Sequence, residues 1–463
     1  MIVCIGASAT MLQAAMKPSE PSPNDADAYW PQWRGPTRTG VAPLGDPPVE
    51  WSESKNVRWK VAIPGRGHAT PIVWGDRIYV QTAVMTDREI EPAPAAEPPA
   101  EPRAEEGGGR RERGRGRMAS PKPTNIHEFV ILALDRKTGG VVWQKLLREE
   151  LPHEGGREDS SQASNSPATD GEVLIAFFGS RGLHCLDMEG EVIWQRDLGK
   201  MQTANGFGEG TSPALHGDTV VINWDHEGQS YIVAFNKETG EELWEVDRDE
   251  RTSWATPLVV EHDGKPQVVT SATNLIRSSD LATGELLWQC KGMTRNAIPS
   301  PVADRALLYA TSGFRGSALL AIRYAEAKGD ITDSPAVVWK YEEGGTPYVP
   351  SPLLYDDLLY FLDTNQEVLS CVDAKSGKPH YTKQRLEELQ GVYASPVGAS
   401  RRVYIAGRNG VTAVLRHGPE FELLATNKLD DKFSSSPVIA GSELYLRGHA
   451  YLYCIAAEEE GES

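Results

Sequence analysis

The segment IVAFNKETGEELW, residues 232–244, decides the fold, because close copies of it recur along the chain. Each copy combines an apolar run, an acidic or amide residue, Thr-Gly or its equivalent, and a closing aromatic residue. The acidic or amide side chain can bond the amides of a tight turn, and glycine supplies the positive φ that the turn needs, so each copy predicts a β-hairpin. The other copies are LALDRKTGGVVW (132–143), LHCLDMEGEVIW (183–194), IRSSDLATGELLW (276–288) and LSCVDAKSGKPHY (369–381), where Tyr381 replaces Trp.

A Ser/Thr-Pro pair occurs eight times, each time before an aliphatic and aromatic run that predicts a strand. Proline removes one ladder donor, which is tolerated at the start or edge of a strand, and it favours extended backbone in the residue before it. Successive pairs are 41 to 51 residues apart except for one spacing of 96, which an insertion explains. The prolines are Pro71, Pro167, Pro213, Pro257, Pro301, Pro352, Pro396 and Pro437.

A small residue occupies one position of the third predicted strand in every copy. Eight small residues at eight equivalent positions indicate a close approach between neighbouring sheets at that layer. They are Ala133, Cys185, Ala234, Ser278, Ala321, Cys371, Ala413 and Cys454.

Eight units of four short strands predict an all-β protein, an eight-bladed β-propeller over residues 56–457. The last unit ends near residues 452–460 after three strands. Segment 56–61 can supply the fourth strand, so we expect the N-terminal strand to complete the last blade and close the ring. The predicted docking tryptophans are Trp59, Trp143, Trp194, Trp244, Trp288 and Trp339.

The A-x-D-x-x-T-G-x-x-x-W hairpin with a Ser/Thr-Pro inner strand resembles the repeat of the pyrroloquinoline quinone (PQQ)-like propeller superfamily over nearly all of 56–457. Segment WPQWRGPTRTGVAP (30–43) resembles a leader of secreted bacterial members. The superfamily includes quinoprotein alcohol dehydrogenases and non-enzymatic propellers, such as the lipoprotein of the outer-membrane barrel-assembly machinery. The resemblance therefore implies either a dehydrogenase that uses PQQ with calcium or a non-catalytic protein.

Known catalytic signatures are absent from the sequence. The resemblance implies a vicinal Cys-Cys pair for quinoprotein alcohol dehydrogenases, but none of the five cysteines is adjacent to another. Glu209 with Asn205 could imitate part of a calcium site, and the ten histidines form no metal-ligand pair at useful spacing. We predict no catalytic residues, no metal site and no cofactor, with PQQ and calcium kept for the dehydrogenase alternative. Cys185, Cys290, Cys371 and Cys454 are expected to be free and buried.

The loops before the inner strands and the turns after the second strands leave a four-stranded blade at the same end. Their polar and aromatic side chains should converge near the axis, where a small ligand or a protein partner could bind. Ordinary solvated loop ends are the alternative. The candidate binding residues are Arg181, Glu209, Trp254, Arg295, Asn296, Arg315, Tyr348, Asn365, Tyr393 and His449.

Three segments lie outside the repeats. Residues 1–20 are apolar and rich in small residues, which favours a signal peptide over a disordered terminus. Residues 29–55 are expected to form a Trp-rich clasp across the propeller, with ligand stacking by Trp30 or Trp33 as an alternative. Residues 86–125 are Pro/Ala/Glu-rich and then Gly/Arg-rich, which predicts a disordered insertion in the first blade. This insertion is either a tether for an anionic partner or a solvated loop.

The net charge of −18 disfavours nucleic acid as a partner, since an acidic surface repels phosphates. No run of 18 apolar residues predicts a transmembrane segment. We expect a monomeric, extracytoplasmic (periplasmic or secreted) binding or scaffolding protein. A PQQ-dependent dehydrogenase and a carbohydrate- or polymer-binding propeller are the alternatives.

Overall fold

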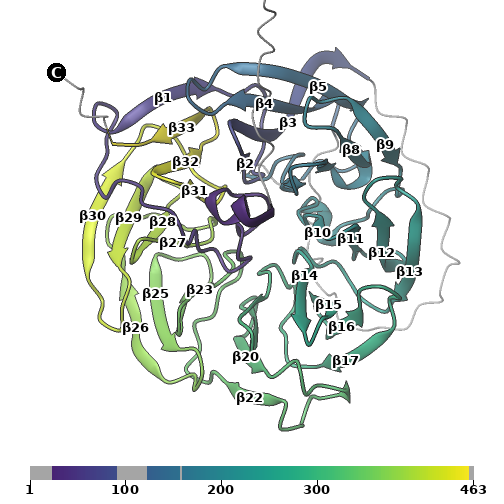
Figure 1. The fold of residues 1–463 in the computed structure, drawn as a ribbon, viewed down its shortest axis with the longest axis vertical. Coiled ribbons are helices and arrows are strands. Elements are labelled where there is room, and N and C mark those ends of the chain that lie inside the picture. The colour runs from purple at the N-terminus through teal and green to yellow at the C-terminus, as the bar shows by residue number, and fades with distance from the viewer. Residues whose placement is uncertain (1–22, 91–122, 157–158, 458–463) are drawn as a thin grey trace, which may run out of the picture.

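Eight sheets surround a central axis in the computed structural model, which describes residues 23–90, 123–156 and 159–457 (Figure 1). Each sheet holds four antiparallel strands, and one sheet gains a fifth, parallel strand. The described residues contain three short 3-10 helices and no α-helix, and no helix among them could span a bilayer. The predicted eight-bladed propeller is confirmed. The 3-10 helices are η1 (Pro23–Ala28), η2 (Gly179–Arg181) and η3 (Ala204–Gly206).

In the first four blades the chain runs from the inner strand to the outer strand. Blade 1 is β2 (Ile72–Trp74), β3 (Arg77–Glu89), β4 (Asn125–Asp135) and β5 (Val141–Glu150); blade 2 is β6 (Ala168–Thr169), β7 (Leu174–Phe177), β8 (Leu183–Leu186) and β9 (Val192–Arg196). Blade 3 is β10 (Ala214–His216), β11 (Thr219–Trp224), β12 (Ser230–Asn236) and β13 (Glu242–Arg248); blade 4 is β14 (Leu258–His262), β15 (Lys265–Ser271), β16 (Ile276–Asp280) and β17 (Leu286–Cys290).

The other four blades have the same order from inner to outer strand. Blade 5 is β18 (Val302–Ala303), β19 (Leu308–Ser312), β20 (Ala318–Ile322) and β22 (Val337–Lys340); blade 6 is β23 (Leu353–Tyr355), β24 (Leu358–Leu362), β25 (Val368–Asp373) and β26 (Pro379–Arg385). Blade 7 is β27 (Val397–Ala399), β28 (Arg402–Ala406), β29 (Val411–Arg416) and β30 (Leu423–Lys428); blade 8 is β31 (Val438–Ala440), β32 (Glu443–Arg447), β33 (Tyr451–Ile455) and β1 (Val57–Ala62). The fifth strand beside β17 is β21 (Gly329–Asp330).

The N-terminal strand β1 completes blade 8, as predicted. It pairs antiparallel with β33, and Trp59 lies opposite Cys454. This pairing joins the first and last strands of the described residues in one sheet and leaves the ring without a gap between the first and last blades.

Strand burial follows from the face-to-face packing of the blades. All four residues of β8 are buried, because the middle of a blade is covered on both faces. In the outer strand β9 only Trp194 is buried, and its four neighbours are exposed. This outer strand therefore buries a single aromatic side chain against its surroundings.

The docking contact explains why the hairpin repeats. The indole Nε1 of Trp244 donates to the carbonyl of Leu281, in the hairpin of the following blade, at 2.9 Å. A Cβ at Gly284 would lie 2.7 Å from the Trp244 ring, so only glycine fits there. Asp280 holds the turn by accepting from the amide of Thr283. Equivalent indole-to-carbonyl bonds join Trp59 to Arg136, Trp143 to Met188, Trp194 to Lys237 and Trp339 to Ala374.

Trp288 departs from this pattern. Its Nε1 donates to Oε1 of Gln267 in its own blade, and the side chain is fully buried. The reason is the longer connection in blade 5, from which β21 adds in parallel beside β17 and pairs Gly329 with Trp288.

The small residues of the third strands lie directly beside these aromatic side chains. Ala133 pairs with Tyr79 on one side and Trp143 on the other, and the two rings approach to 5.9 Å between centroids. A larger residue at this position would collide with the rings, so the constraint lies within the blade as well as between blades. The predicted free, buried thiols are confirmed for Cys185, Cys290, Cys371 and Cys454.

Blade 1 carries the longest strands of the propeller. β3 continues to Glu89 and β4 begins at Asn125, so both strands extend into the predicted insertion, 86–125. The central part of that insertion and the predicted signal peptide lie outside the described residues.

Candidate functional site

The eight Ser/Thr-Pro pairs build a closed ring of side-chain hydroxyls around the axis. The amide of Ser166 donates to the hydroxyl of Ser212 in the next blade at 2.8 Å, and the amide of Ser436 closes the circle on Thr70 at 3.3 Å. Every hydroxyl of this hydroxyl ring accepts one amide from the preceding blade. The members are Thr70, Ser166, Ser212, Thr256, Ser300, Ser351, Ser395 and Ser436.

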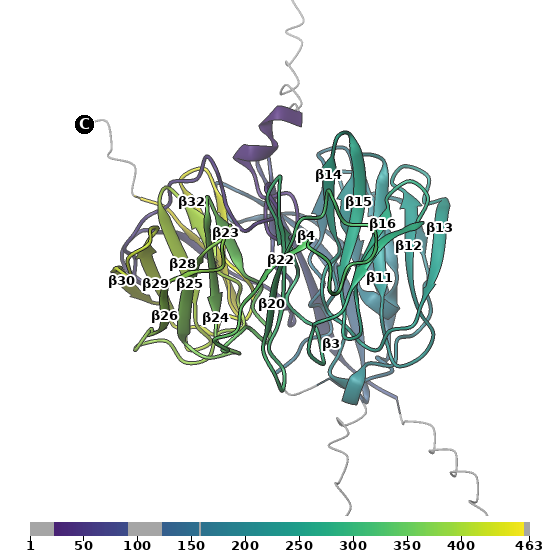
Figure 2. The same ribbon diagram turned by 90° about the horizontal axis from the view of Figure 1, so that it is seen from below.

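The clasp closes one end of the axis. Trp30 exchanges two backbone hydrogen bonds with Val73 of β2, and Trp33 donates its Nε1 to the hydroxyl of Ser300 at 3.1 Å. The buried guanidinium of Arg34 donates to the carbonyls of Pro352 and Pro396 at 2.8 and 2.9 Å. In Figures 1 and 2 the purple N-terminal segment lies over the centre of the ring, on one face only. We call this the clasp end.

The opposite end holds a cavity of about 230 Å³ between the hydroxyl ring and the loops that precede the inner strands. Trp33 forms part of its floor, and Trp254, Tyr348 and Tyr393 stand in its wall. Half of the residues that line it are Ser or Thr, including every member of the hydroxyl ring. We call this end the mouth.

The two carboxylates that line the cavity are both engaged. Glu209 accepts from the amide and hydroxyl of Ser180 at 2.5 and 2.7 Å, and from Arg181 at 3.0 Å. Asp159 accepts from Arg408 at 3.2 Å and from the hydroxyl of Tyr393 at 3.4 Å. Among the described residues, no Lys or Arg lines the cavity. The wall therefore has little net charge.

His68 is the titratable base of the wall. Its ring stacks on His449 at 5.1 Å between centroids. Burial, with the neighbouring His449 and Arg66, lowers the pKa of His68 to about 3, so it is neutral at physiological pH. Its buried Nε2 has no hydrogen-bond partner among the described residues and is free for a ligand group.

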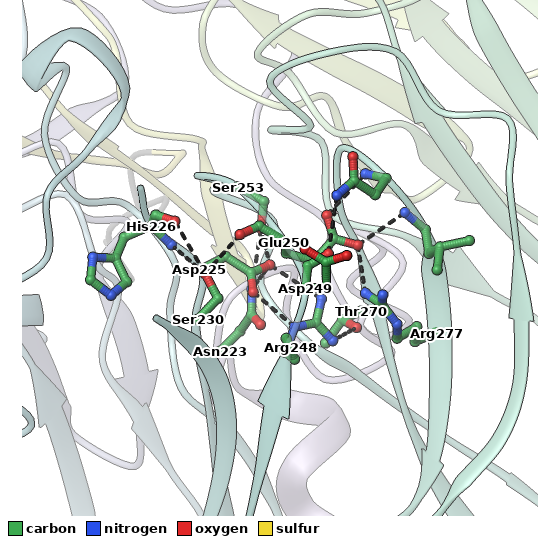
Figure 3. Close-up of polar contacts among 12 residues, drawn as sticks. Asn223, Asp225, His226, Ser230, Arg248, Asp249, Glu250, Ser253, Thr270 and Arg277 are labelled. Carbon is green, nitrogen blue, oxygen red and sulfur yellow. Dashed lines mark hydrogen bonds and ion pairs between the residues drawn. The ribbon is translucent and has the colours of Figure 1, made fainter. Parts of the chain in front are cut away.

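Trp254 is held in place by a buried polar network between blades 3 and 4. Its Nε1 donates to the carbonyl of Gly208 at 2.7 Å. Figure 3 shows Arg248 between Asp225 and Thr270, with Nε at 2.8 Å from Asp225. Ser253, the residue before Trp254, donates to Asp225 at 2.6 Å. An ion pair that is almost completely buried thus fixes the loop on which the ring stands.

The next loop of this network is anchored by Glu250. It accepts from the amides of Asn274 and Leu275. It also accepts from Arg277, which Figure 3 shows beside it. Burial raises the pKa of Glu250, and the bonds from these donors oppose that rise. The cluster holds loops together, and none of its charged residues lines the cavity.

The repeated hairpins, the ring of eight blades and the closed axis agree with a comparison of the sequence with models of known protein families. A model described as "Outer membrane protein assembly factor BamB" matches residues 127–383 and 228–462. The chain belongs to this family of PQQ-like propellers. A comparison with curated proteins finds no match.

Solved structures resemble this BamB-family chain in fold. BamB from Moraxella catarrhalis has a TM-score of 0.51 at 14% identity and covers 70% of this chain and 91% of its own. A europium-containing methanol dehydrogenase has a TM-score of 0.60 at 11% identity, covering 92% and 90%. Quinohemoprotein alcohol dehydrogenase from Comamonas testosteroni has a TM-score of 0.56 at 10% identity, covering 94% and 82%. At these identities the likeness concerns the fold alone.

The BamB-family propeller brings some of the candidate residues together and leaves others apart. Glu209, Trp254, Tyr348 and Tyr393 line the cavity. Arg181 reaches it through Glu209, and His449 through its stacking on His68. Like Arg181 and His449, the remaining four candidates do not line it; they are Arg295, Asn296, Arg315 and Asn365.

The positions of those four have local causes. Arg295 and Arg315 are exposed, and Arg315 lies over the ring of Phe314 at 5.3 Å. Asn296 has a φ of 56° and donates its amide to Thr273. Asn365 accepts from the amide of Val349 at 3.0 Å and so supports the loop that follows Tyr348.

Neither the hydroxyl ring nor the contacts by which Trp33 and Arg34 close the axis were predicted from the sequence. Each Ser/Thr-Pro pair was interpreted as the start of a strand, and no use was made of the hydroxyl. The signal was present, because all eight residues before the prolines carry a hydroxyl. Arg34 had no comparable signal, since its carbonyl partners lie more than 300 residues away.

Proposed function

We propose that this chain is an extracytoplasmic binding or scaffolding propeller that holds a small ligand or a segment of a protein partner at the mouth, without catalysing a reaction. The observation that carries the proposal is the axial cavity itself. Its far end is closed by the clasp, and its wall combines aromatic rings with hydroxyls that can bond to a ligand.

The dehydrogenase alternative requires PQQ and calcium, and the residues of the cavity do not fit them. PQQ carries three carboxylates, yet no described Lys or Arg lines the cavity to balance them. Calcium takes about six to eight oxygen ligands. Glu209 gives both carboxylate oxygens to Ser180 and Arg181, and no group of three potential metal ligands occurs among the described residues. This chemistry favours binding over quinone-dependent oxidation.

Export is supported by the sequence of residues 1–20 and by the family description, which concerns outer-membrane assembly. A fusion of residues 1–30 to a reporter that is active only after export tests this part. The reporter should be active, and an inactive reporter with a full-length fusion product would contradict export.

The mouth is tested by the triple change Trp254→Ala, Tyr348→Ala, Tyr393→Ala. The matched control is Leu243→Ala, Leu286→Ala, Leu423→Ala, which removes side chains that are 46 to 49% exposed on outer strands. Native mass spectrometry and crosslinking in extracts of exported proteins should detect a bound ligand or partner with the parent and the control. The triple variant should keep its circular dichroism spectrum and lose that species. Unchanged binding by the triple variant would place the function elsewhere.

The catalytic alternative has its own measurement. The purified chain, incubated with PQQ and calcium, should show neither a bound-quinone absorbance nor dye-linked oxidation of alcohols. Oxidation that depends on added quinone would overturn the non-catalytic proposal.

A further inference from the structure

We infer that the axial cavity takes one uncharged, hydroxyl-rich ring, the chemistry of a single sugar unit, either free or at the end of a glycan. The inference rests on the proposed binding function and names the ligand class for the same cavity. It is carried by the hydrogen-bonding capacity of the hydroxyl ring, the charge of the wall, the aromatic surfaces and the Nε2 atom of His68, which has no hydrogen-bond partner among the described residues.

The hydroxyl ring is equipped to both donate and accept. A Ser or Thr hydroxyl has one proton and two acceptor positions. In Ser212 one acceptor position takes the amide of Ser166, which leaves the proton and the second acceptor position for a ligand. An anion would use the protons alone and a cation the lone pairs alone. Ligand hydroxyls, which also donate and accept, use both.

The charges of the cavity wall also favour an uncharged ligand. Glu209 and Asp159, the carboxylates of the wall, are each paired with an arginine that does not line the cavity. His68 is neutral at physiological pH. A charged ligand would lose its hydration without gaining a free counter-ion, which is costly in a buried site. A neutral polar ligand avoids that cost.

The aromatic residues supply flat apolar surface at both ends of the cavity. Trp33 forms part of the floor, while Trp254 and Tyr348 stand near the mouth. Each ring is fixed: Trp33 by Ser300, Trp254 by Gly208, and Tyr348 by stacking on Phe314 at 4.9 Å. Sugar rings carry C–H groups on one face and hydroxyls around the edge. That division matches rigid aromatic faces beside a belt of hydroxyls.

The volume and the free base agree with a ligand of this size. A cavity of about 230 Å³ is large enough to admit one substituted six-membered ring. The buried Nε2 of His68 lacks a partner among the described residues, and a buried polar atom without a partner is costly. A ligand hydroxyl would satisfy it.

The experiment uses the full-length chain and a panel of methyl glycosides, including gluco-, galacto-, manno- and N-acetylglucosaminides. Saturation-transfer NMR finds binders, and calorimetry gives the affinity. At least one glycoside should bind with one-to-one stoichiometry. Oligosaccharides ending in that unit form a second arm, and tighter binding there identifies a glycan end as the natural source.

Two variants tie binding to the cavity. Ile298→Trp fills it, since Ile298 lines the wall, and affinity should fall at least about tenfold, the loss expected when an anchoring pocket is removed. Tyr348→Ala replaces one aromatic face with a smaller side chain, so it does not block the cavity, and it should also weaken binding. The test therefore stands even if Ile298→Trp fails to fold. The matched control, Leu423→Trp on the exposed rim, should bind like the parent.

The outcomes separate this inference from the proposed function. If no glycoside binds but the triple variant of the mouth still loses a co-purifying ligand or partner, the sugar inference fails and the binding function stands. If a glycoside binds equally to the parent and to both cavity variants, the sugar site lies elsewhere and the inference fails. If no glycoside binds and the triple variant loses nothing, both proposals fail.

Discussion

The two ends of the axial channel are built from different kinds of contact. At the clasp end, backbone groups and buried side chains bond to one another across blades, as with Arg34 and the carbonyls of Pro352 and Pro396. The docking hairpins lie at this end too, since the amide of Lys237 in one hairpin donates to Asp218 in the turn between the inner two strands. At the mouth, aromatic rings and hydroxyls border an open volume.

The difference separates stability from recognition. Side chains at the clasp end, such as Trp30 and Arg34, are buried against the protein itself, so they contribute mainly to the fold. Side chains at the mouth are held in place yet keep exposed faces and free hydrogen-bonding positions, as His68 does. Substitutions at the two ends should therefore act on different properties, stability at the clasp end and ligand affinity at the mouth.

The largest effect is expected for Trp30→Ala at the clasp end. Trp30 is fully buried, and truncation of such a side chain costs about 3–5 kcal/mol through lost burial and the cavity left behind. The melting temperature and the midpoint of denaturant unfolding should both be lower for the variant than for the parent. A loss below about 1 kcal/mol would mean that the clasp contributes little and that the two ends do not differ as described.

A smaller loss should follow overpacking beside a docking tryptophan. Cys185 lies opposite Trp194 and is completely buried, so Cys185→Leu should cost about 1–3 kcal/mol. Cys185→Ala is the control and should be milder. Burial also raises the pKa of Cys185 to about 12, so the native thiol should resist a thiol reagent until the chain unfolds. Rapid labelling of the native protein would contradict this packing.

At the mouth, Tyr348→Ala should change stability by only about 0.5–1.5 kcal/mol, the range for loss of an aromatic pair such as Tyr348 with Phe314. Its main effect should be on ligand affinity. A drop in stability as large as that of Trp30→Ala would remove the distinction between the two ends.

The smallest effect concerns a docking hairpin. The bonds from the Thr138 hydroxyl and amide hold the pKa of Asp135 below its usual value. Because the folded-state pKa is the lower one, this contribution is present above the unfolded value of about 3.9 and is lost as the pH falls through the folded pKa. Melting temperatures from pH 7 to pH 3 should fall less steeply for Asp135→Asn than for the parent. Parallel curves would show that the hairpin is insensitive to this charge.

The sequence allowed the fold to be predicted because the decisive contacts are local and repeated. Asp280, Thr283 and Gly284 lie within one hairpin, so their spacing is visible in each copy. The exception at Trp288 could not be foreseen in the same way. Its new partner follows from the length of the connection in blade 5, where spacing indicates only that residues were added.

The candidate site was predicted in outline and not in detail. The blade topology correctly indicated that the loops before the inner strands gather at one end of the axis, the mouth. Four of the ten candidate residues line the cavity there. Side-chain direction within a loop depends on local φ and ψ, as the positive φ of Arg315 and Asn296 illustrates, and spacing carries no such information. The hydroxyl ring was missed because each hydroxyl bonds to a residue in another blade, where the number of intervening residues varies.

The pairing of β1 with β33 has a consequence for the order of assembly. Val57 meets Ile455 across almost the whole chain, so this pair can form only after the last blade has been synthesised. The clasp directly precedes β1 and spans the axis towards blades on several sides, including Val73 in blade 1 and Gly398 in blade 7. The pairing of β1 with β33, which closes the ring of blades, and the placement of the clasp across the axis are therefore coupled steps. A nascent chain that lacks its final blade would be a curved stack with its axis open along its length.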